Sequence, residues 1–275
     1  MSWVMDARAR RALSIRASTG GHMEYVTLEP ADLAREHICC AFSDKKCAEG
    51  YALKKDWLVA QHAHGYRFRR LDARAKVFIE YGPSEECWLP VDAANWMMLG
   101  CFWVSGQFAG KGHAKALLAN VEAVAREQGR CGLLAVAGKK KFHFMSDGKW
   151  LKRQGFVPVD ETAAGFELLA KDLGGMGGTP RFLPTARGAR ADAEKGIVVY
   201  YSNRCPFTEF HVRQSLKDAC DRRGLPLTIH KITSRDEALA APTPATIFSL
   251  FVDGNFVTTD LSVCLDSRLD KVLPR

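Results

Sequence analysis

The sequence predicts an α+β fold in two domains, and three observations support this prediction. Residues 23–173 read as strand, helices, strand meander, strand–loop–helix–strand, helix and two strands, an order that builds a mixed sheet. Residues 174–195 are rich in Gly, Pro and Arg and carry no apolar period, which is typical of a linker. A shorter α/β pattern fills residues 196–275. A chain of 275 residues is long for one compact domain and suits two.

The composition indicates a soluble protein of the reducing cytoplasm. Apolar residues make up 47% of the chain, yet no apolar run is long enough to span a membrane. Nine cysteines without a regular spacing argue against a disulfide scaffold. The formal net charge of +8 attracts anions. We expect no nucleic-acid partner, because neither a basic-aromatic stacking pattern nor a helix-turn-helix signal is present.

Residues 1–22 are expected to be a disordered basic extension. They contain four arginines and one aspartate, so about +3 of the net charge belongs to this segment. An Arg-rich, acid-poor start is also compatible with a transit peptide. We favour disorder, because chain termini are usually poorly ordered.

The elements of the first domain follow from their apolar periods. Residues 66–71 alternate like a half-exposed strand, residues 72–75 form a turn, and residues 76–81 are the returning strand. Residues 96–104 are a nearly continuous apolar strand, and residues 115–128 have the period of a helix. The remaining predicted elements are strand 24–28, helices between 30 and 58, strand 131–137, helix 146–154, and strands 155–159 and 166–169.

The loop between strand 96–104 and the following helix has the residues needed to bind a diphosphate. Small residues let the backbone approach phosphate oxygens, and a helix N-terminus favours negative charge. Two templates do not fit. A P-loop requires Gly-Lys-Ser/Thr, but Lys111 precedes Gly112, and the dinucleotide motif Gly-x-Gly-x-x-Gly fails at Lys115.

The same stretch resembles the acyl-coenzyme A loop of the GNAT N-acetyltransferases. Their pattern is a strand ending in Val, a polar segment, [R/Q]-x-x-G-x-[G/A] and a helix. Counting from Val104 places the small positions at Gly112 and Ala114 and the Arg/Gln position at Ala109, which departs from the family. Gln107-x-x-Gly110-x-Gly112 satisfies the string two residues earlier. Further resemblance to the YoaP-type subgroup lies in Cys39-Cys40, Lys55-x-Trp57, 78–81, 87–93, 103–106 and Gln154-Gly155-Phe156.

The resemblance implies acetyl transfer from acetyl-coenzyme A to an amine on a small molecule or peptide, without a metal. The backbone N–H near Val104 would polarise the thioester carbonyl, and loop amides would hold the diphosphate. The implied cofactor-binding residues are Phe102, Trp103, Val104, Ala109, Gly110, Lys111, Gly112, His113, Ala114 and Lys115.

A general base is expected because an amine acceptor must lose a proton. Glu80 is the first candidate and Glu86 the second, although each taken singly is more often a solvated or ion-paired glutamate. Many relatives have a Tyr as general acid four residues before the glycine of the Gly-Phe pair, and here that position is Leu151. Asp147, Ser146 and His143 lie nearby without matching the motif, so the acid stays open.

Cysteine and histidine clusters do not predict a metal site. His37, Cys39, Cys40 and Cys47, or His62 and His64, lack the spacing of a closed zinc site. Ordinary packing or a thiol-lined acceptor cleft is the preferred interpretation.

The second domain, 196–275, resembles a thioredoxin-like domain and the one that follows the acetyltransferase in YoaP-type proteins. Cys205 sits at a strand-to-helix junction, where a helix N-terminus can lower a thiol pKa, and Pro244 falls where that family carries a cis-proline. Thr208 replaces the second cysteine of C-x-x-C. Recognition or homodimerisation is therefore expected for this domain. Thiol-redox chemistry at Cys205 with acyl-coenzyme A sensing, or cofactor binding without transfer, are the alternatives.

Overall fold

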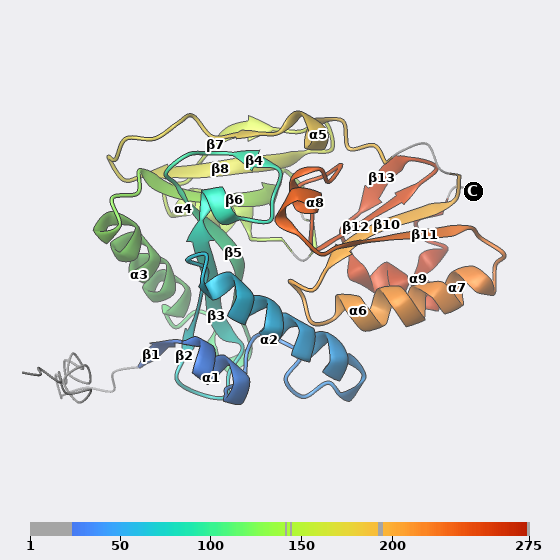
Figure 1. Cartoon of the computed structure of the whole chain (residues 1–275), viewed down its shortest axis with the longest axis horizontal. Coiled ribbons are helices and arrows are strands. Elements are labelled where there is room, and N and C mark those ends of the chain that lie inside the picture. The colour runs from blue at the N-terminus through green and yellow to red at the C-terminus, as the bar shows by residue number, and fades with distance from the viewer. Residues whose placement is uncertain (1–23, 141, 144, 192–194, 274–275) are drawn as a thin grey trace, which may run out of the picture.

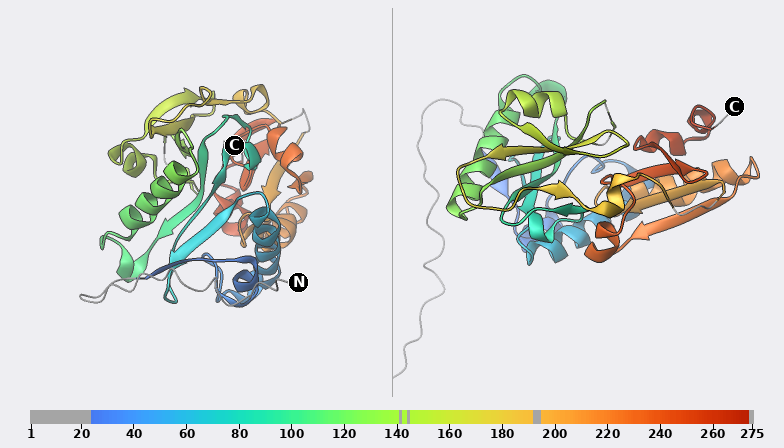
Figure 2. Two further views of the ribbon diagram at one scale, coloured as in Figure 1. Left: turned by 60° about the vertical axis from the view of Figure 1, so that its left-hand side comes forward. Right: turned by 90° about the horizontal axis from the view of Figure 1, so that it is seen from above.

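The computed structural model describes residues 24–140, 142–143, 145–191 and 195–273. The predicted extension, residues 1–22, lies outside the described residues. Figure 1 shows the two larger β-sheets side by side along the long axis of the molecule, and Figure 2 shows them in two further views. No helix among the described residues combines the length and the apolar character needed to cross a bilayer.

The first sheet has seven strands in the order β1-β2-β3-β5-β6-β8-β7. Its neighbours are antiparallel except β5 and β6, which run parallel. Its strands are β1 Tyr25–Thr27, β2 Arg67–Leu71, β3 Val77–Pro83, β5 Met97–Val104, β6 Gly132–Gly138, β7 Val157–Glu161 and β8 Phe166–Asp172. The predicted mixed sheet is thus confirmed.

β5 and β6 pair over only two residues. Met97 is opposite Leu133 and Met98 is opposite Leu134, after which no further pair joins the strands. β5 nevertheless continues to Val104, still paired with β3 on its other side. Successive residues of a strand direct their N–H groups to opposite edges. The backbone groups of β5 beyond Met98 that do not face β3 are therefore directed into the gap between β5 and β6.

Helices cover both faces of the first sheet. α3 (His113–Glu127) packs Leu117 and Val121 against Val77 and Ile79 on one face. α2 (Ala48–His62) packs against Phe78 on the other face, as the alternation of β3 requires. The remaining short elements here are α1 Pro30–Arg35, η1 Lys45–Cys47, η2 Ser84–Glu86, β4 Val91–Asp92, η3 Gly106–Phe108 and α4 Gly148–Arg153.

The segment expected to be a linker contains regular structure. β9 (Arg181–Phe182) pairs with β4, and α5 (Pro184–Arg187) follows directly. Phe182 is 1% exposed and belongs to an apolar cluster with Phe166 and Leu168 of the first sheet. The absence of an apolar period concealed this, because a two-residue strand is too short to show one.

The second sheet has four strands in the order β11-β10-β12-β13. β10 runs parallel to β11 and antiparallel to β12, and β13 returns antiparallel to β12. The elements are β10 Ile197–Ser202, α6 Thr208–Phe210, the π-helical η4 His211–Leu216, α7 Lys217–Asp221, β11 Leu227–Ile232, α8 Arg235–Leu239, β12 Phe248–Val252, β13 Asn255–Thr258, η5 Leu261–Cys264 and α9 Asp266–Leu269. Leu265, which is extended, separates η5 from α9.

Two further comparisons with the sequence concern the second sheet. No cis peptide bond occurs among the described residues, so Pro244 is trans and the cis-proline suggested for it is wrong. Apolar clusters include residues from both sheets: Phe256 packs with Phe166, and Ile232 belongs to the same cluster as Trp88. The thioredoxin-like assignment and the boundaries 23–173 and 196–275 remain predictions.

Candidate active site

The loop after β5 exposes backbone N–H groups at the start of α3. Gly112 is the N-cap of this helix and has φ 85°, and Gly110 has φ 75°. A Cβ built on either glycine would have no atom within 4 Å, so both face open space. The N–H groups of Gly112 and of the first three helical residues have no acceptor within the described chain. The observed geometry fits a bound anion.

Charges around this loop also favour an anion. No acidic residue lies in the first turn of α3, while Lys111 and Lys115 are exposed beside it. Ala109 and Ala114 add small side chains. The side chain of His113 is 1% exposed, and its Nδ1 lies 2.9 Å from the Tyr25 hydroxyl. Only the backbone of His113 is available to a phosphate.

The end of β5 carries the other predicted cofactor residues. The side chain of Val104 packs against the core beneath α3. Phe102 contacts Trp150 of α4 edge-on, with ring centroids 5.4 Å apart, and Trp103 is 49% exposed. Phe102 and Trp103 border a cavity, and Val104 does not.

This cavity, of about 430 Å³, lies between the two sheets. Glu80 and Cys101 line it from the first sheet, and Cys40 from the loop after α1. The second sheet and its loops contribute Arg204 and Cys205. The C-terminal part of the chain therefore covers this end of β5.

Glu80 is the buried carboxylate of the cavity. Its Oε2 accepts hydrogen bonds from Lys54 Nζ and the Tyr66 hydroxyl, each at 2.8 Å. Its Oε1 has no partner among the described residues, although it is buried. Glu80 lies where the β3–β5 register shifts, next to Gly100. An added Cβ at Gly100 would overlap the Tyr66 hydroxyl, so the glycine makes room for this network.

Glu86, the second candidate base, lies elsewhere. It is in η2, does not line the cavity, and pairs with His64 at 3.2 Å. Its side chain is 43% exposed, so this contact contributes little. The structure brings Glu80, and not Glu86, to the β5 edge.

Of the candidate general acids, only some line the cavity. Leu151 is 1% exposed in the core beneath α4, and the Asp147 carboxylate caps that helix by accepting from Trp150 N at 3.0 Å. Ser146 and His143 line the cavity. Neither has a contact that identifies it as the acid.

Burial keeps the thiols of the cavity protonated. Desolvation raises the pKa of Cys205 to about 12 and that of Cys40 to about 11, and it raises the pKa of Cys39 and Cys101 strongly. The expectation that a helix N-terminus lowers the Cys205 pKa is thus wrong, because desolvation is the larger effect. Among the described residues, no three His, Cys, Asp or Glu side chains are grouped to hold a metal.

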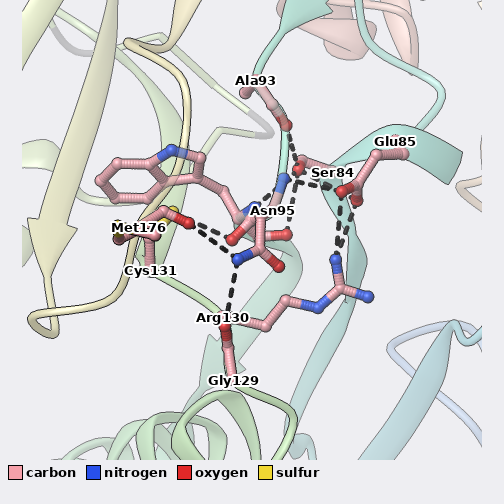
Figure 3. Close-up of polar contacts among 9 residues, drawn as sticks. Ser84, Glu85, Ala93, Asn95, Gly129, Arg130, Cys131 and Met176 are labelled. Carbon is pink, nitrogen blue, oxygen red and sulfur yellow. Dashed lines mark hydrogen bonds and ion pairs between the residues drawn. The ribbon is translucent and has the colours of Figure 1, made fainter.

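A polar network secures the closed end of the β5–β6 gap (Figure 3). Asn95 has φ 65°, and its side-chain amide donates to the carbonyls of Gly129 and Met176 at 3.0 and 2.9 Å. Its N–H donates to Glu85, which also binds Arg130. These bonds hold the start of β5 beside the start of β6, so the strands can part only at their other ends.

Sequence reasoning missed Lys54, Tyr66 and Arg204. Lys54 is 0% exposed in α2, where the pattern Lys54-Lys55 indicates a solvated surface. Tyr66 precedes β2 and Arg204 follows β10, far apart in the chain. No spacing in the sequence signals that these residues meet.

Comparisons with known proteins show the family of this chain. The YoaP-like family matches residues 226–271. The N-acetyltransferase YoaP of Bacillus subtilis (strain 168) is 38% identical over 239 residues, which cover 87% of this chain and 94% of that protein. The chain belongs to the YoaP-type GNAT N-acetyltransferases. It is therefore an acyltransferase.

Solved structures resemble part of this YoaP-type chain. An acetyltransferase of the GNAT family from Desulfovibrio desulfuricans is 19% identical, covers 56% of the chain and 99% of its own length, and has a TM-score of 0.39. The GNAT family N-acetyltransferase YhbS from Escherichia coli, solved in complex with CoA, is 12% identical, with coverages of 61% and 93% and a TM-score of 0.40.

Proposed function

We propose that this protein transfers the acetyl group of acetyl-coenzyme A to a primary amine by direct attack in a ternary complex. The observation that carries the proposal is the combination of free amides at Gly112–Lys115 with the parted strands β5 and β6. A diphosphate fits the glycine cradle, and an extended pantetheine arm fits the free edge of β5. Acetyl-coenzyme A supplies the activated acetyl thioester.

Main-chain donors of β5 orient and polarise the reacting carbonyl in this proposal. They are directed into the gap by strand pairing with β3, so they need no reorganisation during the reaction. The side chain of Val104 only packs against the core, so any contact of Val104 with the thioester is made by its backbone N–H. Phe102 and Trp103 contribute apolar surface to the adjoining wall of the cavity.

Glu80 accepts the proton that the acceptor must lose. An amine with a lysine-like pKa of ~10.4 is free at pH 7 in only about one molecule in several thousand, a penalty of about 4–5 kcal/mol. The proton is accepted by Oε1 of Glu80, a buried carboxylate oxygen without a partner among the described residues. As the new C–N bond forms, the C–S bond breaks and the coenzyme A thiolate leaves.

Thiol-redox chemistry at Cys205 is the weaker alternative. A nucleophilic thiol needs a lowered pKa, whereas burial raises the pKa of Cys205 to about 12. Thr208, at the resolving position, instead donates its hydroxyl to the carbonyls of Ser202 and Cys205, each at 2.8 Å.

Release of coenzyme A thiol over a panel of primary amines tests the proposal. We expect amine-dependent release and a matching acetylated product by mass spectrometry. Binding of acetyl-coenzyme A without sustained release of coenzyme A thiol would show that the protein binds the cofactor but does not transfer the acetyl group. Complete loss of release in Cys205→Ser, together with a trapped Cys205 adduct, would favour the redox alternative.

A further inference from the structure

Arg204 is a buried cation at the cavity wall with half of its guanidinium unused. It follows β10 and is 7% exposed. Its Nη1 donates to the Trp88 carbonyl at 3.1 Å and to the Thr246 hydroxyl at 2.8 Å. Its Nε and Nη2 have no acceptor within the described part of the chain, and no carboxylate there lies within 4.0 Å.

The cavity does not neutralise this charge. Glu80 is already paired with Lys54 at 2.8 Å, so that pair contributes no net charge. The thiols of Cys40, Cys101 and Cys205 are neutral because burial raises each pKa. The Trp57 ring, whose centroid lies 5.8 Å from Arg204 Cζ, offsets part of this charge, and an anionic ligand would neutralise the rest.

The free side of Arg204 has the geometry of a carboxylate site. Nε–H and one N–H of Nη2 point in parallel, as the two oxygens of a carboxylate require. The bonds from Nη1 to Trp88 and Thr246 fix the plane of the guanidinium before any ligand arrives. A cavity of about 430 Å³ suits a small molecule.

We propose that the amine acceptor carries a carboxylate, which Arg204 binds while the amine faces Glu80. The substrate class is then small amino acids and related amine-carboxylates, and the C-terminal part of the chain selects it. This inference rests on the proposed acetyl transfer. It explains why the second sheet closes over the acceptor side of β5, because Arg204 and Cys205 belong to that half of the wall.

The test compares matched acceptors on the full-length protein. Small α-, β- and γ-amino acids are each paired with their carboxamides, and kcat/KM is measured by coenzyme A release. A charge-assisted bidentate contact is worth about 1.5–3 kcal/mol, so we expect the acid to exceed its amide by about 10- to 150-fold. The inference is overturned if no acid exceeds its amide while amines are acetylated, and that result leaves the proposed function intact.

Variants assign the preference to Arg204. Arg204→Met should raise KM for the acids by about 10- to 150-fold and change KM for the amides little, which removes the discrimination. Arg204→Lys keeps the charge without the parallel N–H pair and should retain part of the preference. Arg153→Met, at an exposed position in α4, is the matched control and should behave like wild type.

Each outcome decides between the alternatives. If Arg204→Met discriminates as wild type does, Arg204 does not bind the carboxylate and the inference fails. If Arg204→Met does not fold by circular dichroism, wild-type discrimination together with its reduction in Arg204→Lys supports the inference, and an unchanged ratio in Arg204→Lys contradicts it. If no amine is acetylated while calorimetry still detects coenzyme A, the proposed function fails as well.

Discussion

Glu80 shows how one side chain serves both stability and the proposed chemistry. Lys54 and Tyr66 hydrogen-bond one oxygen, while the other is buried and has no partner among the described residues. The ion pair neutralises two buried charges, which restrains the carboxylate without consuming both of its acceptors. In the proposed mechanism, this pairing holds the carboxylate in position to accept the proton of the amine.

We expect Glu80→Gln to lower kcat by about 10²- to 10⁴-fold, because a carboxamide cannot accept the proton. The free energy of unfolding should also fall, by about 3–5 kcal/mol at most, since Lys54 loses its partner. Tyr66→Phe is the control: it removes one hydrogen bond, costs about 1 kcal/mol, and keeps the carboxylate. Equal kcat values for the two variants would contradict the role of Glu80.

Cys205 predicts a pH dependence of stability. Its pKa is raised from 9.0 to about 12, so its contribution is complete below pH 9 and is lost as pH rises through 12. Urea unfolding at pH 8–11 should show wild-type stability falling relative to Cys205→Ala by up to about 1.4 kcal/mol per pH unit above pH 9. Parallel curves would show that the thiol is not desolvated.

At the scale of elements, the loop–helix junction at Gly112 is the clearest functional feature. Its positive φ turns the chain into α3 and exposes the first N–H groups of the helix. Glycine also leaves space that any side chain would fill. The junction therefore combines a conformational requirement with a steric one.

Gly112→Glu should weaken acetyl-coenzyme A binding at least tenfold, through steric block and repulsion of the phosphates. Gly112→Gln has the same size without the charge, so the difference between the two variants measures the electrostatic part. Calorimetry gives both affinities. Unchanged affinity in Gly112→Glu would place the diphosphate elsewhere.

The segment 174–195 is a second element whose role is decided by packing. Phe182→Ala should lower the free energy of unfolding by about 3–5 kcal/mol, because it empties a site in the core beside β8. Met176→Ala, in the same segment but 91% exposed, should change it by less than about 0.5 kcal/mol. Equal small effects in urea unfolding would mean that the segment is only a linker.

At the scale of the whole molecule, the cavity exists because the two sheets pack together. α2 of the first half approaches the chain beside Cys205 so closely that a Cβ on Gly50 would overlap the Pro206 carbonyl oxygen. This contact joins the two halves of the chain beside the cavity. Specificity is therefore sensitive to the packing of the halves, even far from β5.

Gly50→Ala should shift one wall against the other and raise the acceptor KM several-fold, while coenzyme A affinity stays unchanged. The control is Gly188→Ala, an exposed glycine whose added Cβ would meet no atom within 4 Å. Steady-state kinetics with the best acceptor, plus calorimetry, gives both values. A parallel loss of coenzyme A affinity would mean that the two sites are not separable.

Local patterns determined much of this protein. The apolar run ending at Val104, the small residues at Gly110 and Gly112 and the helical period after them predict the strand, loop and helix that form. These features depend on residues that are neighbours in the sequence, so the sequence alone predicts them. The preference for Glu80 over Glu86 also came from the sequence, and the structure places only Glu80 in the cavity.

Tertiary structure alone decided the partners of those features. Lys54 is buried because α2 lies against the strand that carries Glu80, and Arg204 meets the cavity because the second sheet folds back over the first. The thiol pKa of Cys205 depends on the same enclosure, which outweighs its local position at a helix start. Burial and charge pairing depend on residues that are distant in the sequence, so no local pattern predicts them.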